Sequence, residues 1–248
     1  MKAGYKLGIT VSALLLLAYG LLYSTQNVSA AADGKISGTV KLDGTAPHMK
    51  PIDMSKDPVC VKAHEGHPAV LENVIVGQGG GLENVVLYLS EGLPASAASE
   101  VPSQPQKYDQ HGCMYVPHVL GVDVNQKIEV TNSDPTTHNI HPMPKPGGGN
   151  IGWNKSQPQG APPIVTEWKT EEVAIPIKCN IHPWMHGWHV VVKGPYAVTD
   201  DKGSYTINNV PPGNYTVTAW QEMYGTQTQK VTVAAGKPGT ADFTFKAK

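Results

Sequence analysis

The sequence predicts an all-β protein with sandwich architecture. Gly and Pro are abundant, with 26 Gly and 21 Pro among 248 residues, a composition that favours many short strands joined by turns. No apolar repeat of 3.6 residues is sustained after residue 30, so long amphipathic helices are not expected. The sequence also contains 10 His and 7 Met but only 3 Cys, and this excess of metal-binding residue types makes a metal site worth seeking.

The first 30 residues predict a secretory signal. Lys2 and Lys6 precede an apolar run over residues 7–23, and small residues at 28–30 form a cleavage site after Ala30. The alternative is an uncleaved membrane anchor, because about 17 apolar residues are the lower limit for spanning a bilayer. The mature chain is therefore expected in the periplasm, outside the cell or at its surface, with membrane contact only if the signal is retained.

The rest of the chain alternates between short strands and turns. Turn residues at 43–44, 201–203 and 211–213 separate several β-rich runs. Two stretches rich in Pro, Gly or Ser, residues 94–106 and 142–163, are expected to be loops. The predicted strands are residues 35–42, 85–89, 122–132 in two parts around a turn, 173–177, 189–193, 205–207, 215–220, 229–233 and 242–245.

Charge and cysteine content narrow the class of protein further. The formal net charge is −1 and all 19 basic residues are Lys, which argues against a nucleic-acid partner. Three Cys most simply make one disulfide and one free thiol. Cys179 has the richest metal-ligand surroundings, so a Cys60–Cys113 disulfide is expected, the alternative being three free, buried thiols.

One short segment concentrates metal-binding side chains. Cys179, His182 and Met185 lie within seven residues, and His138 belongs to a separate His-Asn-Ile-His string. Two imidazoles, a thiolate and a weak axial thioether are the ligands of electron-transfer copper sites. The spacing predicts three ligands on one tight loop, with the distant His138 closing the site.

These residues resemble the cupredoxins, and most closely the short-loop amicyanin type. The resemblance covers residues 105–194 and implies a Greek-key β-sandwich that binds one type 1 (blue) copper through His138, Cys179, His182 and Met185. It gives Asn139 a supporting role that locks the two ligand loops together. It also implies that His182 reaches the surface within an apolar patch, for which Pro142, Pro183 and Trp184 are the candidates for partner docking.

The ends of the chain resemble a second family, the carboxypeptidase regulatory-like domain, a small immunoglobulin- or transthyretin-like β-sandwich. Residues 199–205 and 211–217 match the second half of that domain, and residues 38–44 and 84–89 match its first half. We therefore expect residues 31–104 and 195–248 to form one discontinuous sandwich with the copper domain inserted. The alternative is that residues 36–104 add edge strands to the copper domain.

The expected function is single-electron transfer by Cu(II)/Cu(I) between transient redox donor and acceptor proteins. The alternatives are a copper chaperone or store, and a structural surface module with a vestigial site. An enzyme is not expected, because the His-x-His pairs of a multicopper cluster are not repeated. A second metal site is conceivable among four histidines near Cys60 and Cys113 in the sequence: His64, His67, His111 and His118.

Overall fold

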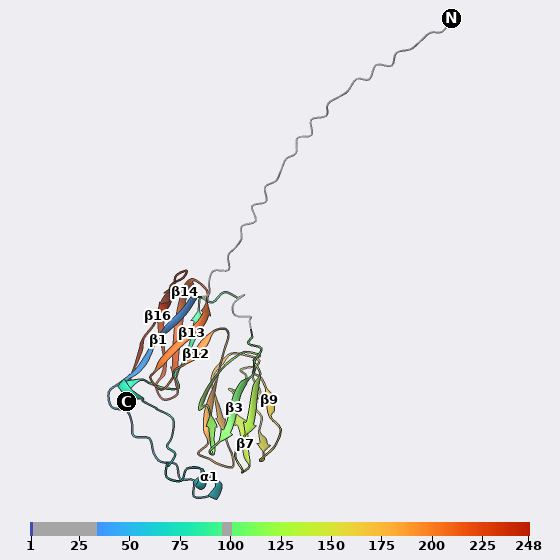
Figure 1. The fold of residues 1–248 in the computed structure, drawn as a ribbon, viewed down its shortest axis with the longest axis vertical. Helices are drawn as coiled ribbons and strands as arrows, with labels where there is room; N and C mark the ends of the chain where they lie inside the picture. Colours follow the sequence, from blue (N-terminus) through green and yellow to red (C-terminus); the bar gives the residue numbers. More distant parts are fainter. Residues whose placement is uncertain (2–33, 96–100) are drawn as a thin grey trace.

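The computed structural model describes Met1, residues 34–95 and residues 101–248. The predicted signal peptide therefore lies, apart from Met1, outside the described residues. Within them, no helix combines the length and the apolar character needed to cross a membrane. The described chain is almost entirely β, as predicted, and its strands form four sheets that pack as two sandwiches (Figure 1).

The first sandwich combines strands from both ends of the chain. One of its sheets has the order β13 (Ser204–Val210), β1 (Gly34–Asp43), β16 (Gly239–Thr240), and β17 (Phe243–Lys246) also pairs with β1. The other sheet has the order β12 (Tyr196–Val198), β2 (Val86–Glu91), β14 (Gly213–Gln221), β15 (Gly225–Val233). In Figure 1 the blue strand β1 accordingly lies among orange and red strands from the C-terminal part of the sequence.

The second sandwich is built from the middle of the chain. Its five-stranded sheet has the order β5 (Val119–Asp123), β11 (His186–Val192), β10 (Glu172–Lys178), β7 (His138–Pro142), β8 (Lys155–Gln157). The facing sheet has the order β4 (Met114–Val116), β3 (Gln106–His111), β6 (Ile128–Asn132), β9 (Ile164–Thr166). The sequence did not predict β8, which lies within the expected loop 142–163, nor the polar strand β3 (QKYDQH).

Each sandwich has its own apolar core because alternate strand residues point inward. In β1, Ile36 and Val40 are fully buried in the first core together with Val217 of β14. Tyr108 and Ile128 are fully buried in the second core. A third cluster joins the sandwiches and contains Val86, Val119, Val190, Val192 and Trp220.

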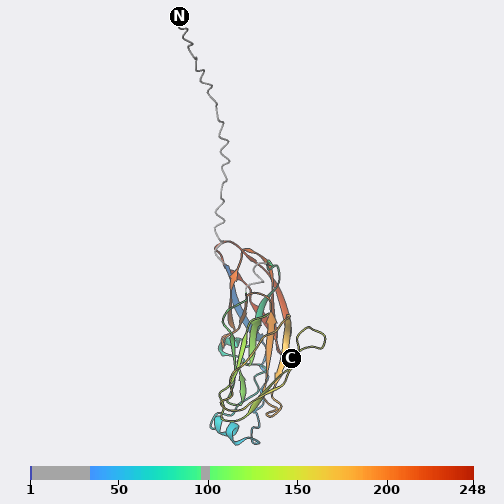
Figure 2. The same ribbon diagram turned by 90° about the vertical axis from the view of Figure 1, so that its right-hand side faces the viewer.

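The segment between β1 and β2 leaves the first sandwich and packs against the second. It contains helix α1 (Pro58–Ala63) and the short 3-10 helix η1 (Gln78–Gly80). Met54 and Cys60 are buried in the second core, although the sequence placed residues 31–104 in the first sandwich. Figures 1 and 2 both show α1 at the end of the molecule formed by the second sandwich. This packing was not predictable from the sequence, because it depends on contacts with residues about 50 or more positions away.

Candidate metal centre

The predicted ligand loop is a compact turn between β10 and β11. The His182 N–H donates to the Cys179 Sγ at 3.3 Å, and the Met185 N–H donates to the His182 carbonyl at 2.9 Å. The Cys179 N–H donates to the Met185 carbonyl at 3.1 Å, which closes the turn. His138 begins β7, and β7 pairs with β10 directly before the loop. Strand pairing therefore brings the distant histidine to the loop.

The structure brings three of the four predicted ligands together in the protein interior. Ligand atoms of His138, Cys179 and His182 lie within 4.8 Å of one another. The two Nδ1 atoms of the histidines are 2.9 Å apart, and the His182 Nδ1 is 3.9 Å from the Cys179 Sγ. All three side chains are at most 3% exposed, and Met185 is fully buried in the same core.

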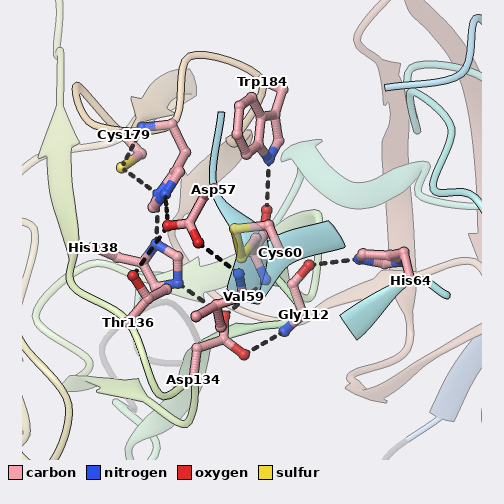
Figure 3. The surroundings of a disulfide bond; sticks show 12 residues. Asp57, Val59, Cys60, His64, Gly112, Asp134, Thr136, His138, Cys179 and Trp184 are labelled. Carbon is pink, nitrogen blue, oxygen red and sulfur yellow. Dashed lines mark hydrogen bonds and ion pairs between the residues drawn. A yellow bond between two sulfur atoms is a disulfide. The ribbon is translucent and has the colours of Figure 1, made fainter. Parts of the chain in front are cut away.

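A carboxylate holds the outer nitrogen of each histidine. The His138 Nε2 lies 2.8 Å from the Asp134 Oδ2, and the His182 Nε2 lies 2.9 Å from the Asp57 Oδ2 (Figure 3). A metal-binding histidine commonly donates its other ring N–H to a carboxylate in this way, which fixes the tautomer and the orientation of the ring. Sequence analysis missed both acids. The only local signal was the Asp57-Pro58 helix start.

This hydrogen bonding leaves two nitrogen lone pairs facing each other. If both Nε2 atoms carry the protons that they donate to Asp134 and Asp57, both Nδ1 atoms are acceptors. Two acceptors at 2.9 Å require a proton or a cation between them. Burial lowers the pKa of His138, but the bonds to Asp134 and Cys179 outweigh it and raise the pKa to about 9. The two imidazoles therefore favour a positive charge between their Nδ1 atoms.

Cys179 is prepared to act as a thiolate. Burial raises the pKa of its thiol, but hydrogen bonds from His138 and from nearby backbone N–H groups outweigh burial and lower the pKa. The Asn139 Oδ1 accepts the N–H of Asn180 at 2.7 Å and lies 3.4 Å from the Cys179 Sγ. Asn139 thus ties the β7 strand to the ligand loop. Two imidazoles, a thiolate and a buried thioether fit copper by donor type.

A disulfide ties together the two carboxylates that hold the histidines. Cys60 and Cys113, the pair favoured from the sequence, form a disulfide, and Cys179 is free. Asp57 caps the N-terminus of α1 through a 2.8 Å bond from the Val59 N–H, and Cys60 lies within that helix. The Asp134 carboxylate accepts the N–H of Cys113 at 2.7 Å. The site and the disulfide therefore form one connected unit (Figure 3).

The expected docking patch differs from the structure. His182 is only 3% exposed, because Asp57 and its helix cover the edge that was expected at the surface. Pro142 is buried and contributes no surface, whereas Pro183 is exposed. Trp184 is half-buried, and its Nε1–H donates to the Cys113 carbonyl at 3.1 Å. The patch named from the sequence is thus reduced to Pro183 and part of Trp184.

The four histidines suggested as a second site do not come together. His64 bonds to the Gly112 carbonyl, and His111 lies 3.9 Å from Asp134. Of the four, only His118 belongs to a candidate ligand group among the described residues, and its partners there are His186 and Glu222. Sequence analysis missed Glu222 because the turn after β14 comes from the other sandwich.

Comparison with a family model agrees with the second of the two resemblances. Residues 186–246 match the family model of the carboxypeptidase regulatory-like domain. The first residues of that match are β11, which lies in the second sandwich, so the match extends beyond the first sandwich. Comparison with curated protein sequences finds no match.

The solved structures similar to this chain include cupredoxins. Amicyanin from Paracoccus versutus is 15% identical, with 43% of this chain and 97% of that chain covered and a TM-score of 0.32. A purple cupredoxin from Nitrosopumilus maritimus is 19% identical, with 35% and 99% covered and a TM-score of 0.29. The copper nitrite reductase of Thermus scotoductus is 17% identical, with 42% and 26% covered and a TM-score of 0.32. This chain thus spans about a quarter of the reductase.

Proposed function

We propose that this protein binds one type 1 copper and carries single electrons between transient redox partner proteins. The observation that carries the proposal is the buried group of His138, Cys179 and His182, in which both imidazole Nδ1 atoms face inward beside a thiol of lowered pKa. Met185 would supply the weak fourth ligand. Bound copper would supply one-electron exchange between Cu(II) and Cu(I).

The chain's own contribution is to hold the ligands in one arrangement. Asp134 and Asp57 fix the two rings, and Asn139 fixes the loop that carries Cys179. A site whose ligands do not move when the charge changes has a small cost of rearrangement, which suits electron transfer more than release of metal to a partner. The same packing excludes water from the thiolate, since Cys179 is 2% exposed.

The compartment and the domain arrangement belong to the same proposal. The disulfide supports an oxidising location, periplasmic or extracellular, reached through the predicted signal. We infer that residues 105–194 form a copper domain inserted into a regulatory-like sandwich of residues 31–104 and 195–248. The segment 51–70 is an exception, since it covers the copper domain. We propose that neither sandwich catalyses a reaction on a substrate.

Direct electrochemistry tests this function. Protein loaded with one equivalent of copper is expected to give a reversible one-electron wave, and repeated cycling should leave its copper content unchanged. A copper store would instead release Cu(I) to a chelator after reduction or bind several ions per chain. Either of those results would favour the storage alternative over the carrier.

A further inference from the structure

A second cluster of metal-binding side chains lies at the junction of the two sandwiches. His118 lies between β4 and β5, His186 begins β11, and Glu222 follows β14 of the other sandwich. Their ligand atoms lie within 4.8 Å of one another. The two imidazole rings are 5.1 Å apart between centroids and nearly perpendicular, at 89°. Three separate parts of the chain thus converge on one point outside the predicted copper site.

The hydrogen bonds around this cluster direct its donor atoms inward. The His186 Nδ1 lies 3.0 Å from the Trp184 carbonyl, which accepts its proton, so the Nε2 is the acceptor nitrogen and accepts the Asn73 Nδ2–H at 3.3 Å. The His118 Nε2 lies 2.5 Å from the Glu222 Oε1. The other Glu222 oxygen accepts the Trp188 Nε1–H at 2.8 Å, which fixes the carboxylate. Metal-binding histidines and carboxylates are typically oriented by such outer partners.

The charges of the cluster are unbalanced when both imidazoles are neutral. Glu72 lies 3.7 Å from the His118 Nδ1, so two carboxylates surround one buried ring. His118 is 4% exposed, and its Nδ1 has no hydrogen-bond partner. Burial raises the pKa of Glu72, and neighbouring Glu222 adds to this effect against the opposing histidines. A bound cation would offset the repulsion between the two acids.

We propose that His118, His186 and Glu222 form a second, thiolate-free site for a divalent transition-metal ion, with the Glu72 carboxylate as a nearby negative charge 3.7 Å from the His118 Nδ1. Two imidazoles and one carboxylate are a zinc ligand set with an open fourth position. Binding would displace the proton between His118 and Glu222 to solvent. Because Glu222 comes from the first sandwich and both histidines from the second, the ion would fasten the two together. This proposal is independent of copper at the first site.

Zinc titration of metal-free Cys179→Ser protein tests the site, because this background lacks the thiolate of the first centre. We expect one Zn²⁺ per chain by calorimetry or by competition with a chelating dye. Glu72→Gln removes a negative charge beside the site without removing a ligand, so it should weaken binding by roughly 10-fold. His186→Gln and Glu222→Gln each remove a ligand and should weaken binding by more than about 100-fold.

Matched variants decide where the zinc binds. His182→Gln removes a histidine of the first centre, and His67→Gln removes an exposed histidine outside both clusters; both should keep the affinity. Circular dichroism checks that each variant is folded, and His186→Gln and Glu222→Gln avoid replacing the buried His118. Absence of zinc uptake would overturn the proposal, and so would an affinity that is unchanged in both His186→Gln and Glu222→Gln. Uptake lost in His182→Gln would assign the ion to the first centre and would also overturn it.

Discussion

At the scale of single residues, two carboxylates far apart in the sequence control the orientation of the two site histidines. Asp57 and Asp134 each accept a ring N–H. Asp57 also accepts the backbone N–H of Val59, and Asp134 accepts those of Gly112 and Cys113. Burial raises the pKa of Asp134, but the bonds from His138, Cys113 and Gly112 outweigh it, so the pKa is lowered and the side chain stays ionised. The two carboxylates can therefore influence the potential of a metal held by the histidines, although they would not bind it themselves.

Asp57→Asn is therefore expected to raise the midpoint potential of the copper protein. The amide oxygen can still accept the His182 Nε2–H, but the negative charge that favours Cu(II) is lost. Exchange of a charged for a neutral acceptor costs about 1 kcal/mol. For one electron, about 59 mV corresponds to about 1.4 kcal/mol, so we expect a rise on the order of 50 mV by voltammetry. Asp53→Asn, on an exposed carboxylate bonded to Ser55, should leave the potential unchanged. Equal potentials in the two variants would contradict this role of Asp57.

Asp123 gives a pH prediction away from the metal site. Burial raises the pKa of its carboxyl from 3.8 to about 6, although the N–H of Gly194, at 2.9 Å from the Oδ1, lowers it. A raised pKa in the folded state stabilises the protein below about pH 4, and this contribution is lost as the pH rises through about 6. Relative to the unmodified protein, Asp123→Asn should therefore gain stability between pH 4 and pH 7. Urea unfolding at both pH values measures the difference, and a difference that does not change with pH would refute the assignment.

The candidate ligands could be named from the sequence at this scale because they follow a short sequence pattern. Cys179, His182 and Met185 lie on one loop, so their spacing alone indicates a site. Asp57 was not predictable, since it lies 125 positions from His182 and reaches it only through the fold. The exposure of His182 was predicted wrongly for the same reason.

At the scale of elements, strand β1 depends on close backbone contact with the C-terminal strands. A Cβ on Gly38 would lie 1.9 Å from the Ala241 carbonyl oxygen, where β1 passes from pairing with β16 to pairing with β17. Gly38→Ala should therefore destabilise the protein by about 1–3 kcal/mol, the usual cost of overpacking. Ser37→Ala, one residue earlier, adds no atom and should be close to neutral. Thermal unfolding compares the two, and equal melting temperatures would show that β1 is not held there.

The strands with strong alternation were predictable, whereas the short or polar ones were not. Residues 35–42 and 215–220 show a clear apolar alternation and correspond to β1 and β14. Helix α1 spans only six residues, too few for a helical repeat to show. Its position is fixed by the disulfide to Cys113 and by the bond between Asp57 and His182, neither of which is a local contact.

At the scale of the whole molecule, a buried apolar contact couples the two sandwiches. Trp220 of the first sandwich is 6% exposed and packs edge-on against Trp188 of the second, with ring centroids 5.7 Å apart. Val86, Val119 and Val190 extend the contact. The pairing of the two chain ends followed from the sequence resemblance, but this contact did not, because it lies between regions that resemble different families.

The metal-free protein is accordingly expected to unfold in a single thermal transition, with equal calorimetric and van't Hoff enthalpies. Trp220→Ala should lower the free energy of unfolding by about 3–5 kcal/mol. It should also separate the single transition into two, one for each sandwich. Two transitions in the unmodified protein would show that the contact does not couple the sandwiches.

The most direct test of the copper assignment is the visible absorption of the protein with one equivalent of Cu(II). We predict one copper per chain and an intense thiolate-to-copper band, which Cys179→Ser abolishes and Met185→Leu retains with a higher midpoint potential. His141→Gln should keep the band, because His141 bonds to Asn180 and belongs to no candidate ligand group among the described residues. A colourless Cu(II) complex, or a band that survives Cys179→Ser, would contradict the assignment.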